Sequence, residues 1–244
     1  LFHNRRILFR TDDSVLRIGP ERVPVLLRRS RGYVPGLLTL SAPVARVALG
    51  LGGDLKNAPA LARGTDVYLA PFIGDLEDPV TFADFHRQVA RILELYGVRP
   101  EIVACDLHPL YHSSRWADGF GEGRRVGVQH HHAHALAVMA EHGLEQALAL
   151  SFDGTGYGLD GTIWGGEFLD VDRRGFRRLG CFRPFPLPGG EAAVLQPLRA
   201  ALALLASCLI PGEIERLLCR DGRLSAPDAR FLLDMIGRGL NSPL

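Results

Sequence analysis

Lysine is almost absent from this chain, and neither sign of charge dominates it. Of the 28 basic residues, 27 are arginine and one, Lys56, is lysine, and they stand against 27 acidic residues for a net charge of +1. A chain so balanced carries no strong electrostatic signal for nucleic acid or for an anionic membrane surface.

Long hydrophobic runs and paired cysteines are also missing. The richest apolar stretch, residues 200–210, is about a dozen residues long and therefore too short to span a bilayer. No signal-peptide pattern opens the chain. The four cysteines are scattered without a C-x-x-C pair, which argues against a structural zinc knuckle and favours free thiols in a reducing cytoplasm. We therefore expect a cytoplasmic protein that does not cross a membrane.

Lys56 is the exception to the preference for arginine. An ammonium is a compact charge and a guanidinium is a planar fork, so a lysine kept in this background is a candidate for a specific role. It lies in the glycine-rich segment 52–57, directly after a strand pattern, where a turn can meet a phosphate. A catalytic or phosphate-binding Lys56 and an exposed turn residue kept by chance both remain open.

The pattern of elements predicts an α/β fold. A chain of 244 residues, 47% hydrophobic, can form one large or two modest domains, and an arginine-rich start ending in glycine and proline predicts a boundary near residue 40. Because the chain opens on Leu1 in what reads as mid-domain sequence, we expect a fragment. Periodicity predicts strands at 44–51, 58–62, 66–70, 101–105, 147–153 and 161–171, and helices at 80–96, 129–142, 197–208, 212–220 and 227–238.

The segment 129–134, Gln-His-His-His-Ala-His, gives the strongest chemical signal. His130 and His134 are four residues apart, which in a helix places both imidazoles on one face. The next predicted strand ends at Asp153, and two histidines with an aspartate suit zinc or ferrous iron with open positions for a substrate. A solvated helix face is the alternative interpretation.

Glycine-rich segments follow this aspartate. In Asp153-Gly154-Thr155-Gly156, backbone N–H groups and a hydroxyl come close together after a strand, so we expect a turn that holds a phosphate or directs Asp153 toward a metal-bound phosphate. A plain glycine hairpin is the alternative. Gly165 and Gly166, on the returning strand, favour the close approach of a ligand.

A polar cluster also follows the predicted strand at 101–105. Its members are Asp106, His108, His112 and Arg115, and Pro109 disfavours a regular helix starting at His108. We interpret the cluster as a loop next to a substrate or metal. The carboxyl ends of strands gather ligands in open α/β sheets, so the segments at 52–57, 106–108 and 153–156 predict one shared site.

Taken together, these motifs resemble the hydrogenase maturation carbamoyltransferase family, HypF. The resemblance lies in segments 128–134, 152–158 and 160–167, and in shorter ones at 12–15, 28–33, 55–57, 73–77, 106–109 and 241–244. It covers essentially the whole chain in order. Phe72 and Leu110 depart from the family pattern, which commonly has a histidine and an acidic residue at these positions.

This resemblance implies a domain organisation. Residues 1–40 are expected to be the C-terminal end of a YrdC-like α/β domain. Residues 41–244 are expected to be the N-terminal lobe of a carbamoyl-transfer domain with the actin/hexokinase-like ATPase superfold, with the second lobe missing. A further metal-binding aspartate would lie beyond Leu244.

The resemblance also implies a reaction. In the YrdC-like part, carbamoyl phosphate and ATP give a carbamoyl adenylate, and the carbamoyl group then passes to the C-terminal cysteine of the partner HypE. His130, His134 and Asp153 match the metal ligands, with zinc or iron as the metal, and Asp153 and Lys56 are the expected catalytic residues. Nucleotide or phosphate binding is expected at Lys56, Gly154, Thr155, Gly156, Gly165 and Gly166, and substrate contact near Asp106 and His108.

Three rival interpretations remain. An O-carbamoyltransferase acting on a sugar or antibiotic hydroxyl shares the transfer fold but not the order of domains. A tRNA threonylcarbamoyl transferase is disfavoured, because its glycine motif lacks an aspartate at the position of Asp153. A truncated lobe that binds metal without catalysis is the third.

Overall fold

The computed structural model describes residues 4, 7, 9–121, 123–220, 222 and 224–243. The chain forms two compact units, Leu1–Glu145 and Gln146–Leu244. The boundary predicted near residue 40 falls inside strand β3 (Leu37–Gly50), so no change of element marks it. The assignment of residues 1–40 to a separate domain stays a prediction, and six of its residues, like Leu244 of the last motif, lie outside the described part.

A four-stranded sheet organises the first unit, with the strands in the order β4-β3-β5-β6. Strand β4 (Ala60–Leu69) is antiparallel to β3, whereas β5 (Ile102–Asp106) and β6 (Arg124–Val128) continue the sheet in parallel. The prediction of two strands at 58–62 and 66–70 is wrong. Gly64, at φ 58°, pairs with β3 at a register shift, so one strand continues through the irregularity.

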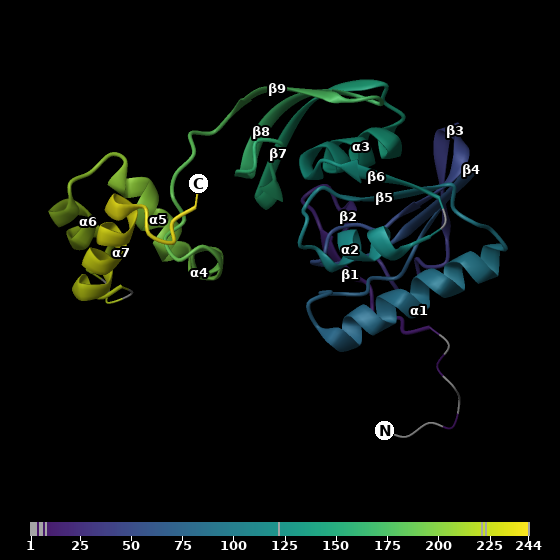
Figure 1. Cartoon of the computed structure of the whole chain (residues 1–244), viewed down its shortest axis with the longest axis horizontal. Coiled ribbons are helices and arrows are strands. Elements are labelled where there is room, and N and C mark those ends of the chain that lie inside the picture. The colour runs from purple at the N-terminus through teal and green to yellow at the C-terminus, as the bar shows by residue number, and fades with distance from the viewer. Residues whose placement is uncertain are drawn as a thin grey trace. The chain divides into compact units, whose positions relative to one another are not determined.

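The first unit also contains three helices: α1 (Pro79–Tyr96), α2 (His112–Gly119) and α3 (His130–His142). Helix α1 begins where the Asp78 carboxylate accepts from the Val80 backbone N–H and ends at Gly97, in the left-handed conformation. Its buried residues pack with those of β3, β5 and α2 around Phe85. Figure 1 shows α1 and α3 on opposite sides of the sheet. The helices predicted at 80–96 and 129–142 are confirmed.

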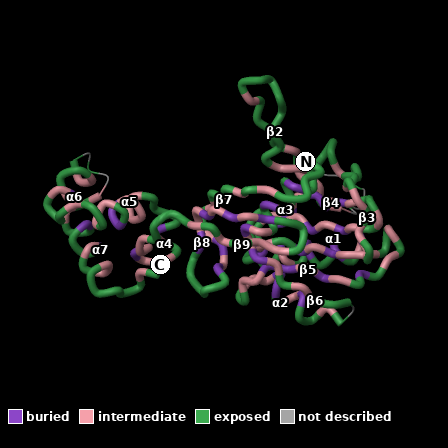
Figure 2. Tube along the Cα trace, turned by 90° about the horizontal axis from the view of Figure 1, so that it is seen from above, coloured by how far each residue is buried: buried purple, intermediate pink, exposed green. Residues whose placement is uncertain are grey.

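The first unit also carries a two-stranded hairpin, β1 (Val15–Ile18) and β2 (Pro24–Arg28). Nearly all of its residues are exposed, as the green loop in Figure 2 shows. Little of the buried core of the unit therefore comes from this segment.

The second unit begins with an antiparallel sheet of β7 (Gln146–Tyr157), β8 (Ile163–Asp172) and β9 (Phe176–Cys181). The turn predicted at 153–156 is wrong, because β7 continues to Tyr157 with a register shift between Phe152 and Gly156. Glycine is compatible with extended backbone, so the chain reverses later, where Gly158 N–H donates to Thr162 at 2.9 Å.

Four helices follow this sheet: α4 (Glu191–Leu195), α5 (Pro197–Ala206), α6 (Pro211–Leu218) and α7 (Ala226–Arg238). The last three confirm the predicted helices and bury Leu202, Ile214 and Leu232 against one another. Together the two units confirm the predicted α/β class. No helix within the described residues has the length and apolar character needed to cross a membrane.

Candidate functional site

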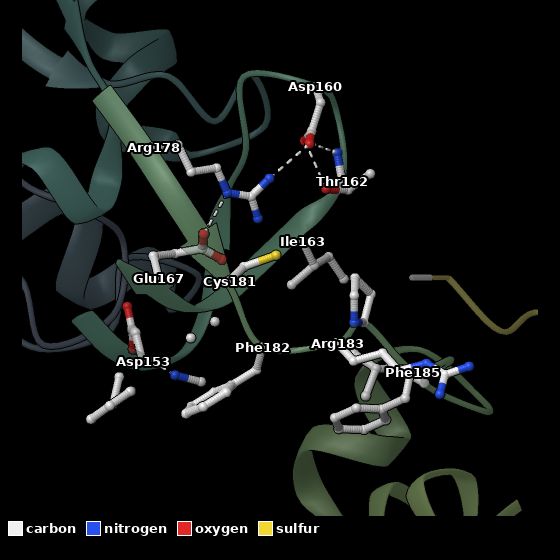
Figure 3. A pocket seen from close by; sticks show the side chains of 16 residues that line it. Asp153, Asp160, Thr162, Ile163, Glu167, Arg178, Cys181, Phe182, Arg183 and Phe185 are labelled. Carbon is white, nitrogen blue, oxygen red and sulfur yellow. Dashed lines mark hydrogen bonds and ion pairs between the residues drawn. The ribbon is translucent and has the colours of Figure 1, made fainter. Parts of the chain in front are cut away.

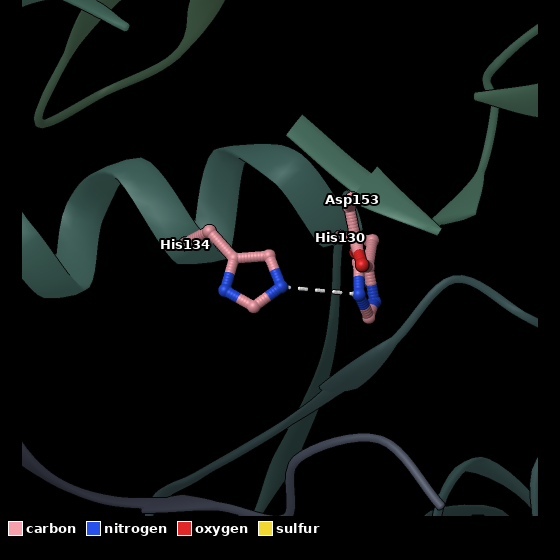
Figure 4. A group of neighbouring side chains, drawn as sticks. All are labelled: His130, His134 and Asp153. Carbon is pink, nitrogen blue, oxygen red and sulfur yellow. Dashed lines mark hydrogen bonds between the residues drawn. The ribbon is translucent and has the colours of Figure 1, made fainter. Parts of the chain in front are cut away.

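The two histidines of the predicted metal face lie together at the start of α3. Gln129 fixes this start, because its side chain accepts from the His132 backbone N–H at 2.9 Å. The Nε2 atoms of His130 and His134 are 3.2 Å apart, as Figure 4 shows. Two imidazole nitrogens bound to one tetrahedral Zn²⁺ are about 3.3 Å apart. The pair therefore has the spacing that one metal ion requires.

Asp106 fixes the orientation of His130. Its Oδ2 lies 2.6 Å from His130 Nδ1, and its Oδ1 accepts from the His108 backbone N–H at 2.8 Å. The carboxylate is only 8% exposed, at the carboxyl end of β5. Metal-binding histidines commonly donate the other ring N–H to such a carboxylate, which leaves the facing nitrogen with its lone pair. Asp106 therefore orients His130, one of the two candidate metal ligands. Its predicted place near a substrate stays a prediction.

Replacing Asp106 with alanine should weaken binding of Zn²⁺ by about 10- to 100-fold, because His130 loses the group that orients its ring. Asp106→Asn should lose less, since its carbonyl oxygen can still accept from Nδ1. Calorimetric titration with Zn²⁺ measures both, with Asp118→Ala as the control, since that carboxylate pairs with Arg125 on the surface. Equal affinities for Asp106→Ala and the control would contradict this assignment.

Two other histidines, His131 of this segment and His108 of the polar cluster, have different surroundings. His131 is completely buried and its Nδ1 lies 3.1 Å from the Gln129 amide nitrogen, so it belongs to the core. His108 stacks on Tyr111 with ring centroids 4.2 Å apart. A Cβ at Gly53 would lie 3.4 Å from Tyr111 and 3.9 Å from His130. The glycine-rich segment 52–57 therefore lies beside the histidine pair. Its position at the carboxyl end of a strand predicted this.

The loop that carries Lys56 is held by two buried side chains. The Asn57 amide donates to the carbonyl groups of Leu51 and Gly53, each at 2.7 Å. The Asp54 carboxylate accepts from the backbone N–H of His112 at 2.8 Å and of Ser113 at 3.1 Å. Asp54 is therefore a link to the start of α2 that sequence reasoning missed, because 58 residues separate Asp54 from His112.

Lys56 itself is exposed and adopts φ 52°. A left-handed backbone is uncommon for residues other than glycine, because it costs conformational free energy. It persists only where the surrounding contacts fix the chain. Here the surroundings are the hydrogen bonds of Asn57 and Asp54. The loop thus presents the single lysine at a fixed place, although its contact with a phosphate stays a prediction.

The second unit contains a cavity of about 480 Å³ between the β7–β8–β9 sheet and residues 182–187. Asp153, Gly154, Gly165 and Gly166 line it, while Thr155 and Gly156 are not among its described lining residues. The close approach expected of a ligand at Gly166 is made by Phe182, whose ring would lie 2.3 Å from a Cβ there. Packing alone thus accounts for this glycine, and its nucleotide contact stays a prediction.

Arg178 dominates the polar end of the cavity (Figure 3). Its Nε donates to Glu167 at 2.6 Å, its Nη1 lies 3.4 Å from Asp160, and its Cζ lies 3.9 Å above the Trp164 ring. The hydrogen bond to Glu167 raises the pKa of Arg178 above its usual value. Sequence reasoning missed this residue, because one arginine among 27 gives no signal of its own.

Asp153 belongs to the second unit and the histidine pair to the first. Its Oδ1 accepts from the Gly154 backbone N–H at 2.7 Å. Its place as a third metal ligand and as a catalytic residue stays a prediction.

Family models match most of the chain. Residues 44–141 match the "HypF Kae1-like domain", and residues 149–244 match "Carbamoyltransferase, Kae1-like Domain, second subdomain". The resemblance implied one N-terminal lobe over residues 41–244, whereas two family models together cover most of this range. Neither model says where a lobe begins or ends, so the lobe boundaries stay a prediction.

Curated relatives agree with these models. Carbamoyltransferase HypF of Synechocystis sp. is 43% identical over 84% of this chain and 27% of its own length. Carbamoyltransferase HypF2 of Cupriavidus necator is 41% identical over 100% of this chain and 30% of its own length. The chain thus spans about a third or less of the length of these two relatives.

Solved structures lead to the same family. A full-length HypF, in a phosphate- and nucleotide-bound form, matches 100% of this chain and 38% of its own with a TM-score of 0.89 and 34% identity. HypF of T. kodakarensis matches 96% of this chain and 32% of its own, with a TM-score of 0.85 and 30% identity. These matches confirm the carbamoyltransferase-type α/β fold that the resemblance implied. The chain belongs to the HypF carbamoyltransferase family.

Proposed function

We propose that this chain is part of an ATP-dependent carbamoyltransferase of [NiFe] hydrogenase maturation. In this proposal, the carbamoyl group of carbamoyl phosphate passes through a carbamoyl adenylate to the C-terminal cysteine of HypE. The observation that carries the proposal is the pair His130 and His134, whose Nε2 atoms are 3.2 Å apart with Asp106 behind one of them. Membership of the HypF family, whose relatives are named carbamoyltransferases, supports the reaction class.

The donor set suits a divalent ion, zinc or iron. His130 and His134 would hold it, and Asp153 would be a third ligand of the kind such ions accept. When bound, the ion supplies Lewis-acid polarisation of a substrate oxygen. Asp106 keeps a proton on His130 Nδ1 and so holds that ring in the tautomer that can bind.

The remaining residues bind and orient the substrates in this proposal. Lys56, from its fixed loop, attracts the phosphate oxygens, and Asp153 and Lys56 are the catalytic residues of the proposal. His108, stacked on Tyr111, lies beside the substrate. The hydroxyl of Thr155 and several backbone N–H groups orient the nucleotide. These N–H groups belong to Gly154, Thr155, Gly156, Gly165 and Gly166.

Lys56→Ala should raise the KM for carbamoyl phosphate about tenfold, because the exposed loop loses its only ammonium for a charge-assisted hydrogen bond to phosphate. Lys56→Arg keeps the positive charge but not the compact ammonium, so it should restore the KM only in part. Arg63→Ala is the control, since it removes another exposed cation from the first unit. Steady-state rates are measured with varied carbamoyl phosphate in HypF2 of C. necator that carries this chain in place of its matching region. An unchanged KM in Lys56→Ala would exclude Lys56 from phosphate binding.

A chimaera tests the whole proposal. This chain would replace the matching region of HypF2 of C. necator, the relative that aligns over all of it. The chimaera should restore hydrogenase activity to a C. necator strain that lacks both HypF2 and the HypF homolog. A chimaera that is produced and folded but restores nothing, while HypF2 itself does, would favour a non-catalytic metal-binding role.

A further inference from the structure

Arg178 is held rigidly at one end of the cavity in the second unit. Glu167, itself 2% exposed, accepts from Nε at 2.6 Å, and the Trp164 ring covers one face of the guanidinium at 3.9 Å. Asp160 lies 3.4 Å from Nη1. Among the described residues, only these two carboxylates accept from the guanidinium. Its Nη2 therefore keeps two N–H groups for a ligand.

Asp160 is also held in place by hydrogen bonds. Its Oδ1 accepts from the Thr162 hydroxyl at 2.7 Å, the Thr162 backbone N–H at 3.1 Å and the Trp164 indole N–H at 2.9 Å. The hydrogen bond from the Thr162 side chain lowers the pKa of Asp160, with the backbone N–H of Thr162 adding to it. Within the part of the chain that the structure describes, its Oδ2 has only the 3.4 Å contact to Arg178, which leaves it able to accept from a further donor.

The polar end therefore offers a donor and an acceptor side by side. The charge of Arg178 is already balanced by Glu167 and Asp160, so a phosphate would meet two carboxylates for one guanidinium. A neutral amide suits this arrangement better, because its oxygen accepts from Nη2 and its NH2 group donates to Oδ2. Apolar side chains, among them Ile163 and Phe185, line other parts of the cavity, and Arg183 also lines it.

We propose that Arg178 and Asp160 form an amide-recognition subsite that binds the carbamoyl end of the substrate. This inference rests on the proposed function, because that function identifies the amide as a carbamoyl group. The subsite accepts a planar group with both an oxygen acceptor and an NH2 donor. It discriminates against acyl groups that lack the NH2, such as acetyl. Arg183 supplies positive charge for the phosphate attached to the carbamoyl group.

Two stable phosphonates test this subsite on the full 244-residue chain. Phosphonoacetamide carries the amide, and acetonylphosphonate replaces its NH2 with a methyl group of similar size. By calorimetry, the amide should bind about tenfold more tightly. Arg178→Lys should abolish this preference, because an ammonium cannot keep the fork geometry that Glu167 and Asp160 fix. Arg177→Lys is the matched control, since the neighbouring Arg177 pairs with Asp170 and is exposed.

Asp160→Asn gives an independent test if Arg178→Lys does not fold. Its Oδ1 can keep the hydrogen bonds of the turn, while the ligand NH2 loses a charged acceptor, so the amide preference should again fall. Equal affinities of the unaltered chain for the two phosphonates, no binding of the amide, or an unaltered preference in a folded variant would overturn the subsite.

The test separates the subsite from the proposed function. A chimaera that restores hydrogenase activity, in a chain without amide preference, would overturn only the subsite. Amide preference in a chimaera that restores nothing would overturn the proposed function and leave an amide-binding cavity.

Discussion

Replacing His130 with alanine should remove the divalent metal from the purified chain. One of two nitrogen ligands 3.2 Å apart is lost, and the Asp106 carboxylate behind it loses its partner. Loss of an orienting neighbour alone costs about 10- to 100-fold in metal affinity, so loss of a ligand should cost more than about 100-fold. His134→Ala should have the same effect, and metal content measured by mass spectrometry after dialysis against zinc or iron gives the comparison.

His142→Ala is the control for this experiment. It removes an exposed imidazole from the last turn of the same helix and should leave the metal content unchanged. Unchanged metal content in both His130→Ala and His134→Ala would contradict the metal site. Equal loss in His142→Ala would show that the altered helix, and not the ligand pair, caused the effect.

Phe85→Ala should destabilise the first unit by about 3–5 kcal/mol, because it removes a large ring from a closely packed core. Phe85 is 0% exposed, and its ring centroid lies 5.5 Å from that of Trp116 on α2. The ring joins α1 to both the sheet and α2. Urea denaturation followed by far-ultraviolet circular dichroism measures the free energy of unfolding.

Val80→Ala provides the comparison on the same helix. Its side chain is 70% exposed, so its effect should stay within about 0.5 kcal/mol. A loss below about 1.5 kcal/mol for Phe85→Ala would mean that the core can collapse around the missing ring, contrary to this packing.

Elements with local signals were predictable from the sequence. Helices α1 and α3 have apolar or histidine spacing of about one turn, and Gly97 and Gly143 end them in the left-handed conformation. Strand β6 escaped prediction because Arg124-Arg125-Val126-Gly127-Val128 shows little apolar alternation. It forms because it pairs in parallel with β5, which no local pattern reveals.

The site shows the same division between local and distant information. His130 and His134 are four residues apart, so helical spacing alone predicted that they meet. The partner of His130, Asp106, is 24 residues away and was predicted only as a neighbour of the site. The turn expected at 153–156 failed because glycine permits both a turn and an extended strand, and pairing with β8 decides between them.

The central claim is that this chain takes part in the transfer of a carbamoyl group from carbamoyl phosphate to the C-terminal cysteine of HypE. The mass of an acceptor peptide tests this claim most directly. The HypF2 chimaera would be incubated with ATP, carbamoyl phosphate and a peptide ending in the C-terminal cysteine of HypE. The proposal predicts the addition of one carbamoyl group at that cysteine, only when both substrates are present. An unmodified peptide, under conditions in which HypF2 of C. necator modifies it, would contradict the proposal.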